Sequence, residues 1–226
     1  MGIILNLETS STNCSVCLAK DGVILATKEL NSENYSHAEK LHVFIEEVMH
    51  EANLKMQHLE AIAVSKGPGS YTGLRIGVSA AKGLCYALDV PLISVSTLKS
   101  MASQLKGVND NAAIIPVLDA RRMEVYSAVF DYHLNQVRET KAEIIDEQSF
   151  QAYISSTSVH FLGSGAEKIK GFFNSNNLIF HLDIVPSAKE MATISFDKFK
   201  KKDFEDVAYF EPYYLKDFVL QTKRDK

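Results

Sequence analysis

The chain has 226 residues, of which 46% are hydrophobic and 23% are charged, an ordinary balance for a soluble globular protein with a packed core. Its formal net charge of −4 excludes a strongly basic nucleic-acid-binding protein, although a local basic patch stays open. Three cysteines do not make the disulfide framework of a small secreted domain. The N-terminus has no basic segment before its apolar run, and no stretch approaches the roughly 18 apolar residues of a membrane span. We therefore expect a cytoplasmic protein that does not contact membranes.

The first half of the chain predicts three strands followed by alternating helices and strands. A turn at Lys20-Asp21-Gly22 separates the second strand from the third. Ser36 and Glu39 form a predicted capping box, and apolar residues at helical spacing follow it. The predicted strands are 3–7, 14–19, 23–30, 61–65 and 92–95, and the predicted helices are 36–53, 73–88 and 97–105.

The second half repeats this order of elements without repeating the residues. The polar segment from Gly107 to Asn111 is the predicted linker. Strands are predicted at 114–118, 124–130, 136–145 and 159–162, with a short helix after the third strand, a helix from about 166 and a last helix to about 201 that a second capping box, Ser187 and Glu190, opens. The double occurrence predicts two α/β units of related topology, 1–106 and 107–226.

The most specific stretch is glycine-rich and joins a predicted buried strand to a predicted helix. Glycines allow positive φ and close backbone approach, and the first N–H groups of a helix attract anions. The stretch is not a Walker A sequence, because no Lys-Ser/Thr pair follows its second glycine. Spacing alone therefore gives only weak support for a phosphate loop. The residues of this motif are Gly67, Pro68, Gly69, Ser70, Tyr71, Thr72 and Arg75.

The helix after this stretch has small residues along one face. At spacings of three and four, they make that face nearly flat, so that another helix could approach closely. Packing on the chain's own sheet and contact with a second subunit are both open on this pattern. The face consists of Gly73, Gly77, Ala80, Ala81 and Leu84.

Five segments together resemble the TsaB family, also called YeaZ, the bacterial accessory proteins of threonylcarbamoyladenosine synthesis on tRNA. The glycine-rich segment is the most distinctive of them, and the likeness covers nearly the whole chain. The segments are Ile4–Ser10, Gly67–Gly77, Asp119–Tyr126, Phe161–Ala166 and Glu211–Lys216.

The resemblance implies a duplicated actin-like ATPase fold with two βββαβα-type subdomains. It further implies a homodimer when alone, a heterodimer with the catalytic paralogue TsaD, and joint work with the ATPase TsaE. In that assembly the chain would be a non-catalytic partner in threonylcarbamoyl transfer to adenosine 37 of tRNA, with tRNA contacted only indirectly. The interface implied is the small-residue face together with Leu41 and Ile45 of the preceding helix. No cofactor would be required, and ATP or ADP would be a ligand of the complex.

Histidine spacing separates this chain from the catalytic relatives, which hold a metal through two histidines four residues apart on one helix. Here His37 and His42 are five residues apart, which leaves them about 140° apart around the helix. They cannot easily bind one ion. We therefore expect no metal site and no activity of the chain alone.

A vestigial nucleotide site stays open as a hypothesis. The segment Thr9–Asn13 occupies the position of the superfamily's phosphate loop, and Glu8 stands where many members carry aspartate. Asp119 begins the corresponding turn of the second half, and the Gly163-Ser164-Gly165 segment could approach an adenosine. The residues of this hypothesis are Glu8, Thr9, Ser10, Asp119, Gly163 and Gly165.

Two other activities remain as alternatives, a self-sufficient ATPase or sugar-kinase-like enzyme of the same fold and a glycoprotease-like peptidase. The peptidase has little support, because the surroundings of Ser70 do not form a G-x-S-x-G elbow.

The three cysteines are predicted to have packing roles, and three arginines have no role that the sequence assigns. Cys14 and Cys17 are three apart on a predicted strand, so they should project to opposite faces, and Cys85 lies in an apolar helix. For Arg75, Arg121 and Arg122, the sequence leaves open whether they touch tRNA or pair with surface carboxylates.

Overall fold

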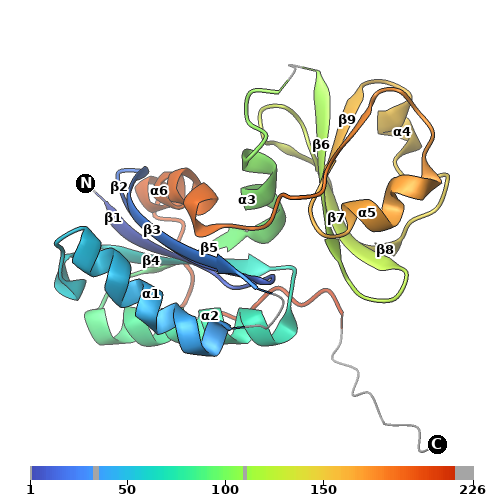
Figure 1. Cartoon of the computed structure of the whole chain (residues 1–226). Coiled ribbons are helices and arrows are strands. Elements are labelled where there is room, and N and C mark those ends of the chain that lie inside the picture. Colours follow the sequence, from blue (N-terminus) through green and yellow to red (C-terminus); the bar gives the residue numbers. More distant parts are fainter. Residues whose placement is uncertain (1, 33–35, 109–110, 217–226) are drawn as a thin grey trace, which may run out of the picture.

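The computed structural model describes residues 2–32, 36–108 and 111–216, which form two lobes that lie side by side (Figure 1). Each lobe is built on a five-stranded sheet. The strand orders are β3-β2-β1-β4-β5 and, in the opposite direction, β10-β9-β6-β7-β8. Three antiparallel strands followed by two parallel ones therefore occur in both lobes, as the repeated order of elements predicts.

The first lobe contains the N-terminal elements, whose bounds agree with the predicted ones to within about two residues for most elements. Apolar side chains from α1 and α2 pack on one face of the sheet, against Leu5, Leu7 and Val16 among others. The elements are β1 (Ile3–Glu8), β2 (Asn13–Lys20), β3 (Val23–Asn31), α1 (His37–Glu51), the 3₁₀ helix η1 (Met56–His58), β4 (Ala61–Gly67), α2 (Tyr71–Leu88), β5 (Leu92–Ser96) and α3 (Thr97–Ser103).

The second lobe has short helices and one strand that the sequence does not predict. That strand, β10, has only four residues and none of them is fully buried, so it lacks the apolar run that marks β6 or β9. The elements are β6 (Ala112–Asp119), β7 (Glu124–Phe130), β8 (Gln136–Ile144), α4 (Gln151–Ile154), β9 (Ser158–Leu162), α5 (Ala166–Ile169), the 3₁₀ helix η2 (Lys170–Phe172) and β10 (Leu178–His181).

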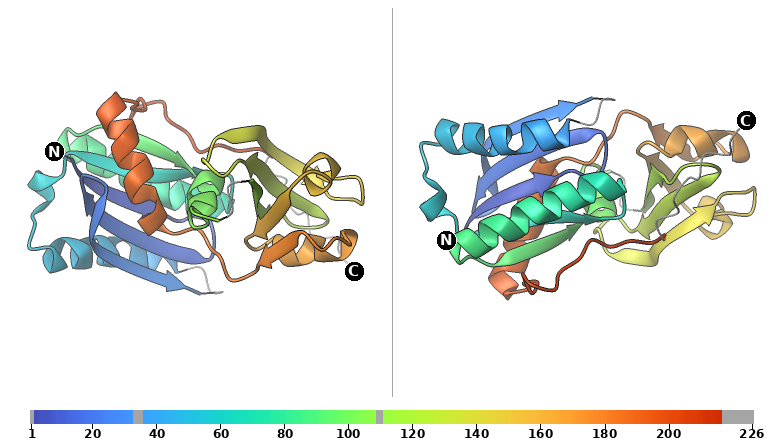
Figure 2. Two further views of the ribbon diagram at one scale, coloured as in Figure 1. Left: turned by 90° about the horizontal axis from the view of Figure 1, so that it is seen from above. Right: turned by 90° about the horizontal axis from the view of Figure 1, so that it is seen from below.

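The last helix returns to the first lobe. After η3 (Ala188–Glu190), α6 (Met191–Lys201) packs on the face of the first sheet opposite α1 and α2 (Figure 2), where Met191 contacts a cluster that includes Ile4 and Ile93. The prediction of one unit over 107–226 is therefore wrong for α6. Apolar periodicity predicts that a helix needs a sheet to cover it, but it does not say which sheet. Asn109 and Asp110 of the predicted linker, and residues 217–226 of that unit, lie outside the described residues.

Neither predicted capping box forms. Ser36 precedes α1, but its side chain makes no capping hydrogen bond. The Ser187 hydroxyl accepts a hydrogen bond from the Lys189 backbone at the start of η3, so it caps this short turn and not α6. The sequence pattern is correct about where helical structure begins, but the bonds that begin it differ.

All three cysteines are buried and unpaired. As predicted, Cys14 and Cys17 belong to clusters on opposite faces of the first sheet. Burial raises the pKa of both thiols to about 11 and that of Cys85 to about 12. The thiols therefore stay protonated at neutral pH and serve packing, not nucleophilic chemistry.

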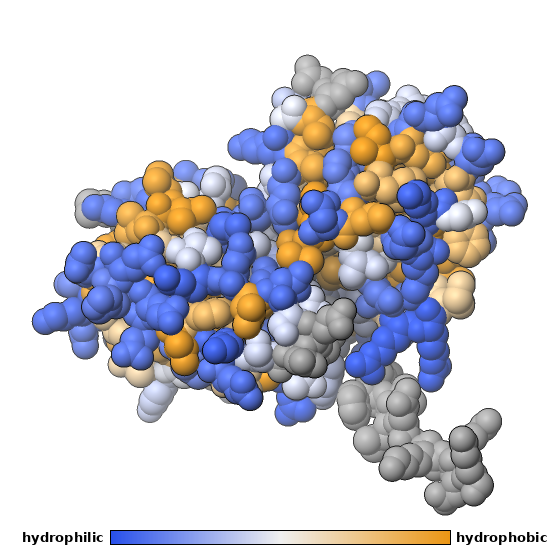
Figure 3. Space-filling model, viewed as in Figure 1, coloured by the Kyte–Doolittle hydropathy of each residue, from blue (hydrophilic) through white to orange (hydrophobic). Residues whose placement is uncertain are grey.

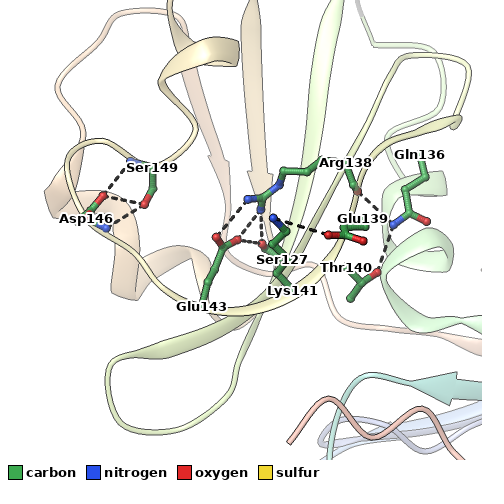
Figure 4. A network of polar contacts seen from close by, with 9 residues as sticks. All are labelled: Ser127, Gln136, Arg138, Glu139, Thr140, Lys141, Glu143, Asp146 and Ser149. Atoms are coloured by element: carbon green, nitrogen blue, oxygen red, sulfur yellow. Dashed lines mark hydrogen bonds and ion pairs between the residues drawn. The ribbon is translucent and has the colours of Figure 1, made fainter.

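A charged network fixes the β7–β8 hairpin (Figure 4). The Arg138 guanidinium donates to the Glu143 carboxylate and, at 2.6 Å, to the Ser127 hydroxyl, and it lies 4.6 Å from the centre of the Phe150 ring. Burial by itself would raise the pKa of Glu143, but the hydrogen bonds from Arg138 and Ser127 outweigh it and hold the pKa below its usual value. The pair therefore stabilises the fold when Glu143 is ionised.

We expect Glu143→Gln to lower the free energy of unfolding by about 1–3 kcal/mol near neutral pH, because Arg138 keeps its charge but loses a charged acceptor. The folded pKa of Glu143 is lowered, so its contribution is complete above the usual value of 4.5 and is lost as the pH falls through the folded pKa. Urea unfolding at neutral and acidic pH measures this. The control is Glu139→Gln on the same strand, whose side chain is 82% exposed. Equal losses in both variants would contradict the assignment.

Candidate functional site

The glycine-rich segment packs backbone to backbone against the turn between β1 and β2. A Cβ atom on Gly69 would lie 2.3 Å from the carbonyl oxygen of Ser10, and one on Gly73 would lie 2.0 Å from that of Thr9. Real Cβ atoms do not approach other atoms this closely. The Thr9 hydroxyl donates to the Gly73 carbonyl at 2.8 Å, and the Ser70 N–H donates to the Ser10 carbonyl at 2.6 Å. Glycine is required here because the start of α2 lies directly on this turn.

This packing corrects the predicted interface. Gly73, Gly77 and Ala81 are buried inside the first lobe, so they do not form an open strip. Leu41 and Ile45 are likewise buried in the core under α1. Small residues show that something approaches closely, but not what approaches, and here the chain's own β1–β2 turn does so.

Ala80 and Leu84 differ from the rest of the predicted face, because they are only partly buried and line an open groove between α1 and α2. The groove has a volume of about 770 Å³. Tyr86, two residues beyond Leu84 on α2, is 89% exposed. The exposed positions of α2 follow the same helical spacing as the buried ones, offset by part of a turn. The pattern of the sequence could therefore have identified the open side of α2. The lining residues are Ala38, His42, Tyr71, Thr72, Arg75, Ile76, Ser79, Ala80, Gly83 and Leu84.

Aromatic contacts connect one end of the groove to the last described segment of the chain. Arg75 donates to the Tyr71 hydroxyl at 3.2 Å and lies 5.3 Å from the centre of that ring. The Tyr71 and Tyr214 rings are 4.9 Å apart between centres. The Tyr213 N–H donates to the Lys66 carbonyl at 2.7 Å. The Glu211–Lys216 segment is thereby fixed beside the glycine-rich segment.

The same segment continues to the second lobe. Lys216 donates to the Ala120 carbonyl at 3.2 Å and pairs with the Glu124 carboxylate. The Ser164 hydroxyl accepts from the Asp119 N–H at 3.1 Å. The five segments that carry the family resemblance are therefore linked to one another through direct contacts at the junction of the lobes.

Most of the predicted nucleotide-contacting residues are engaged within the chain itself. Glu8 is fully buried, and one of its oxygens accepts from the Ser10 N–H at 2.6 Å and the Ser65 hydroxyl at 2.8 Å. Burial raises the pKa of Glu8, although these hydrogen bonds oppose the shift. Thr9 and Ser10 are buried under the glycine-rich segment.

The second half of the predicted nucleotide site is similar. Gly163 and Gly165 are buried against β6, where a Cβ on either would lie within 2.8 Å of Val117 atoms. Asp119 is exposed and pairs with Lys168 at 2.6 Å. Of the six predicted residues, only Asp119 is therefore open to solvent in this arrangement.

The predicted non-ligand histidine, His37, is buried, and its Nε2 lies 2.8 Å from the Ser11 carbonyl oxygen. Across residues 2–32, 36–108 and 111–216, no three His, Cys, Asp or Glu side chains are grouped as a metal site would need. Within those same ranges, none of the helices has the length and apolar character needed to cross a membrane.

Two glycines of α2 allow a matched test of the packing. We expect Gly73→Ala to destabilise the fold by about 1–3 kcal/mol or more, because its methyl group would overlap the Thr9 backbone. Gly83 has nothing within 4 Å of its Cβ position, so Gly83→Ala should stabilise the helix by about 0.5–1 kcal/mol. Thermal unfolding of both variants measures this. Similar effects of the two substitutions would show that the close approach at Gly73 is not as described.

The chain is similar to proteins of known families. The model of the family described as TsaD, tRNA N6-adenosine threonylcarbamoyltransferase, matches residues 32–221. The chain is 29% identical to the tRNA threonylcarbamoyladenosine biosynthesis protein TsaB of Escherichia coli (strain K12) over 97% of each chain.

Solved structures show the same fold. YeaZ from Pseudomonas aeruginosa superposes with a TM-score of 0.82 at 22% identity, over 95% of this chain and 100% of that one. The activator of the 2-hydroxyisocaproyl-CoA dehydratase from Clostridium difficile, solved with bound ADPNP, gives a TM-score of 0.51 at 10% identity, over 90% of this chain and 98% of that one. The predicted α/β fold of the duplicated actin-like ATPase class is confirmed.

Proposed function

The chain belongs to the TsaD-type family and, within it, to the TsaB (YeaZ) group, and from this premise we propose that it is a non-catalytic partner subunit in tRNA threonylcarbamoyladenosine biosynthesis. It docks a TsaD-type catalytic paralogue and works with the ATPase TsaE in threonylcarbamoyl transfer to adenosine 37. The observation that carries the proposal is the open groove between α1 and α2, beside the segments that resemble the family.

The groove suits a helical partner. Its α2 side presents Ser79, Ala80 and Gly83, whose small side chains let a second helix approach closely. Tyr71 and Arg75 stand at one end, and aromatic and arginine side chains are the types that anchor protein interfaces. Hydrophobic patches occur on both lobes among hydrophilic areas in the view of Figure 3, so apolar surface alone does not select a docking face. The shape of the groove is what selects the docking face.

The same face also serves a homodimer. A two-fold axis through one surface makes the contact self-complementary, so two copies can pair through the groove when the paralogue is absent. Binding of the paralogue would then compete with self-association.

The arrangement of the buried residues supports a partner role over catalysis. Glu8, Thr9 and Ser10 occupy the expected phosphate position, but they bond to the glycine-rich segment and to each other. The self-sufficient ATPase and peptidase alternatives gain no support from this geometry. We propose that no cofactor is required and that ATP or ADP binds only in the complex, with Asp119 as the accessible residue.

We expect Ser79→Glu combined with Gly83→Glu to weaken association with the TsaD-type paralogue at least tenfold, or by about 1.4 kcal/mol, because two carboxylates would enter the groove. Both positions are exposed, so the fold should be retained. Isothermal titration calorimetry measures association with the paralogue, and size-exclusion chromatography checks that the variant stays folded. The matched control is Ala152→Glu combined with Thr193→Glu, two exposed helical positions that do not line the groove. Normal pairing of the groove variant would contradict the docking assignment.

Reconstitution tests the role itself. Purified paralogue, ATPase and tRNA, supplied with threonylcarbamoyl-adenylate as the donor, should modify adenosine 37 with this chain present and fail to do so without it. The groove variant should behave as if the chain were missing. Modification at the full rate without the chain would contradict a required partner role.

A further inference from the structure

The turn between β6 and β7 holds two consecutive arginines in an unusual backbone conformation. Arg121 and Arg122 have φ values of 66° and 55°, in the left-handed region. Residues other than glycine and asparagine adopt this region rarely, because the Cβ atom crowds the carbonyl oxygen. Glycine would fit this turn with less strain. The turn nevertheless carries two long cationic side chains, so it keeps their charge at the cost of backbone strain.

Side chains from other elements hold the turn in this shape. The Asp119 carboxylate accepts from the Arg121 N–H at 2.7 Å. Lys168 of α5 donates to the Arg122 carbonyl at 2.7 Å and to the Glu124 carbonyl at 3.3 Å, and it also pairs with Asp119. The backbone of the turn is thus fixed, so the arginine side chains project from a rigid base.

Lys216 adds a second cation from the last described segment. It donates to the Ala120 carbonyl and pairs with the Glu124 carboxylate. Both carboxylates next to the turn, those of Asp119 and Glu124, are therefore paired with lysines.

The arginines are left as the free cations of this cluster. Both are exposed, and neither guanidinium makes a hydrogen bond or ion pair with any residue inside the described ranges. A basic surface of this kind is an electrostatic contact for phosphates even when the whole protein has a net negative charge.

Tyrosines lie near these cations, one of them through space and two of them along the chain. Tyr126 follows the turn on β7 and is half-buried; burial raises its pKa, and the nearby charges of Lys216 and Arg121 oppose the shift. Tyr213 and Tyr214, immediately before Leu215 and Lys216, are 43% and 39% exposed.

Tyr213 and Tyr214 also line a hollow. It has a volume of about 540 Å³, and its walls include Tyr209, Tyr213 and Tyr214, with Lys66, Glu205 and Glu211 among the polar residues. Tyr209 is 84% exposed, so its ring is open to a flat ligand. The two glutamates disfavour phosphates in the hollow itself, which leaves the phosphates to the arginine side.

We propose that the β6–β7 turn and the adjoining tyrosine hollow contact single-stranded RNA directly. Arg121 and Arg122 neutralise neighbouring phosphates, and the tyrosines stack with bases, the combination that sequence-tolerant single-strand binders use. This goes beyond the docking role and replaces the expectation that RNA is contacted only through a partner.

The test uses the full chain with Arg121→Gly and Arg122→Gly combined. Glycine accepts a positive φ, so the melting temperature should be unchanged or higher while both cations are lost. The probe is a fluorescein-labelled oligouridine of about 12 nucleotides, a length within the site sizes of single-strand binders. Fluorescence anisotropy at about 50–200 mM salt should show binding at least about tenfold weaker, and the slope of log K against log salt should shrink by about 1.4, or 0.7 for each lost phosphate contact.

The control variant is Lys200→Gln combined with Lys201→Gln, which removes the same charge from the last turn of α6. It should leave the salt slope unchanged. Tyr214→Leu should weaken binding about fivefold or more without changing that slope, because stacking involves no counterions.

Three results would overturn the proposal. Equal losses in the arginine and lysine variants would mean general electrostatic attraction. Wild-type binding no stronger than that of the arginine variant would mean that no site exists at the turn. Full displacement of the RNA by ATP at the same phosphate concentration would make the turn a small-anion site. Association of the arginine variant with the paralogue, measured in parallel, should be normal, so failure here is separable from failure of the docking role.

Discussion

The structure depends on the contact between two stretches of backbone, the β1–β2 turn and the start of α2. Glycines at 69 and 73 remove the side chains that would keep them apart, and hydrogen bonds from Thr9 and Ser70 close the contact. This contact fixes the position of α2 on the sheet. It therefore also decides which face of α2 is buried and which face, with Ser79 and Gly83, is left for the groove. The glycine-rich segment resembles a phosphate loop in sequence, but here it fixes the position of a helix.

The last described segment contacts both lobes. It contacts the first lobe at Lys66 and Tyr71 and the second lobe at Ala120 and Glu124. The groove, the tyrosine hollow and the arginine turn consequently share one short run of chain, Tyr213–Lys216. A ligand at any one of these surfaces would therefore lie near side chains that belong to the others. The proposed docking and RNA-contacting surfaces are thus neighbours, although the arginine turn belongs to the second lobe and the groove to the first.

Element types and their order could be predicted because apolar periodicity is a local property. The continuous apolar run of β6 and the helical spacing in α1 are visible in the sequence, and so is the repeated order that gives two similar sheets. Tertiary relations could not be predicted this way. The small face of α2 indicated close packing, but its partner, Thr9, is more than sixty residues away in the sequence, and nothing local distinguishes it from another subunit. The left-handed conformation of Arg121 and Arg122 was equally hidden, because no glycine marks it.

The return of α6 to the first sheet has a consequence for synthesis. Until residues 191–201 leave the ribosome, α6 does not yet cover the face of the first sheet around Ile4, Cys17 and Ile93. A nascent chain can assemble the α1–α2 side early, but it carries an apolar surface through translation of the whole second lobe. Such exposed surface is what chaperones bind and what aggregation begins from. The two lobes are thus linked in time as well as in space, because the first cannot mature before the second has been made.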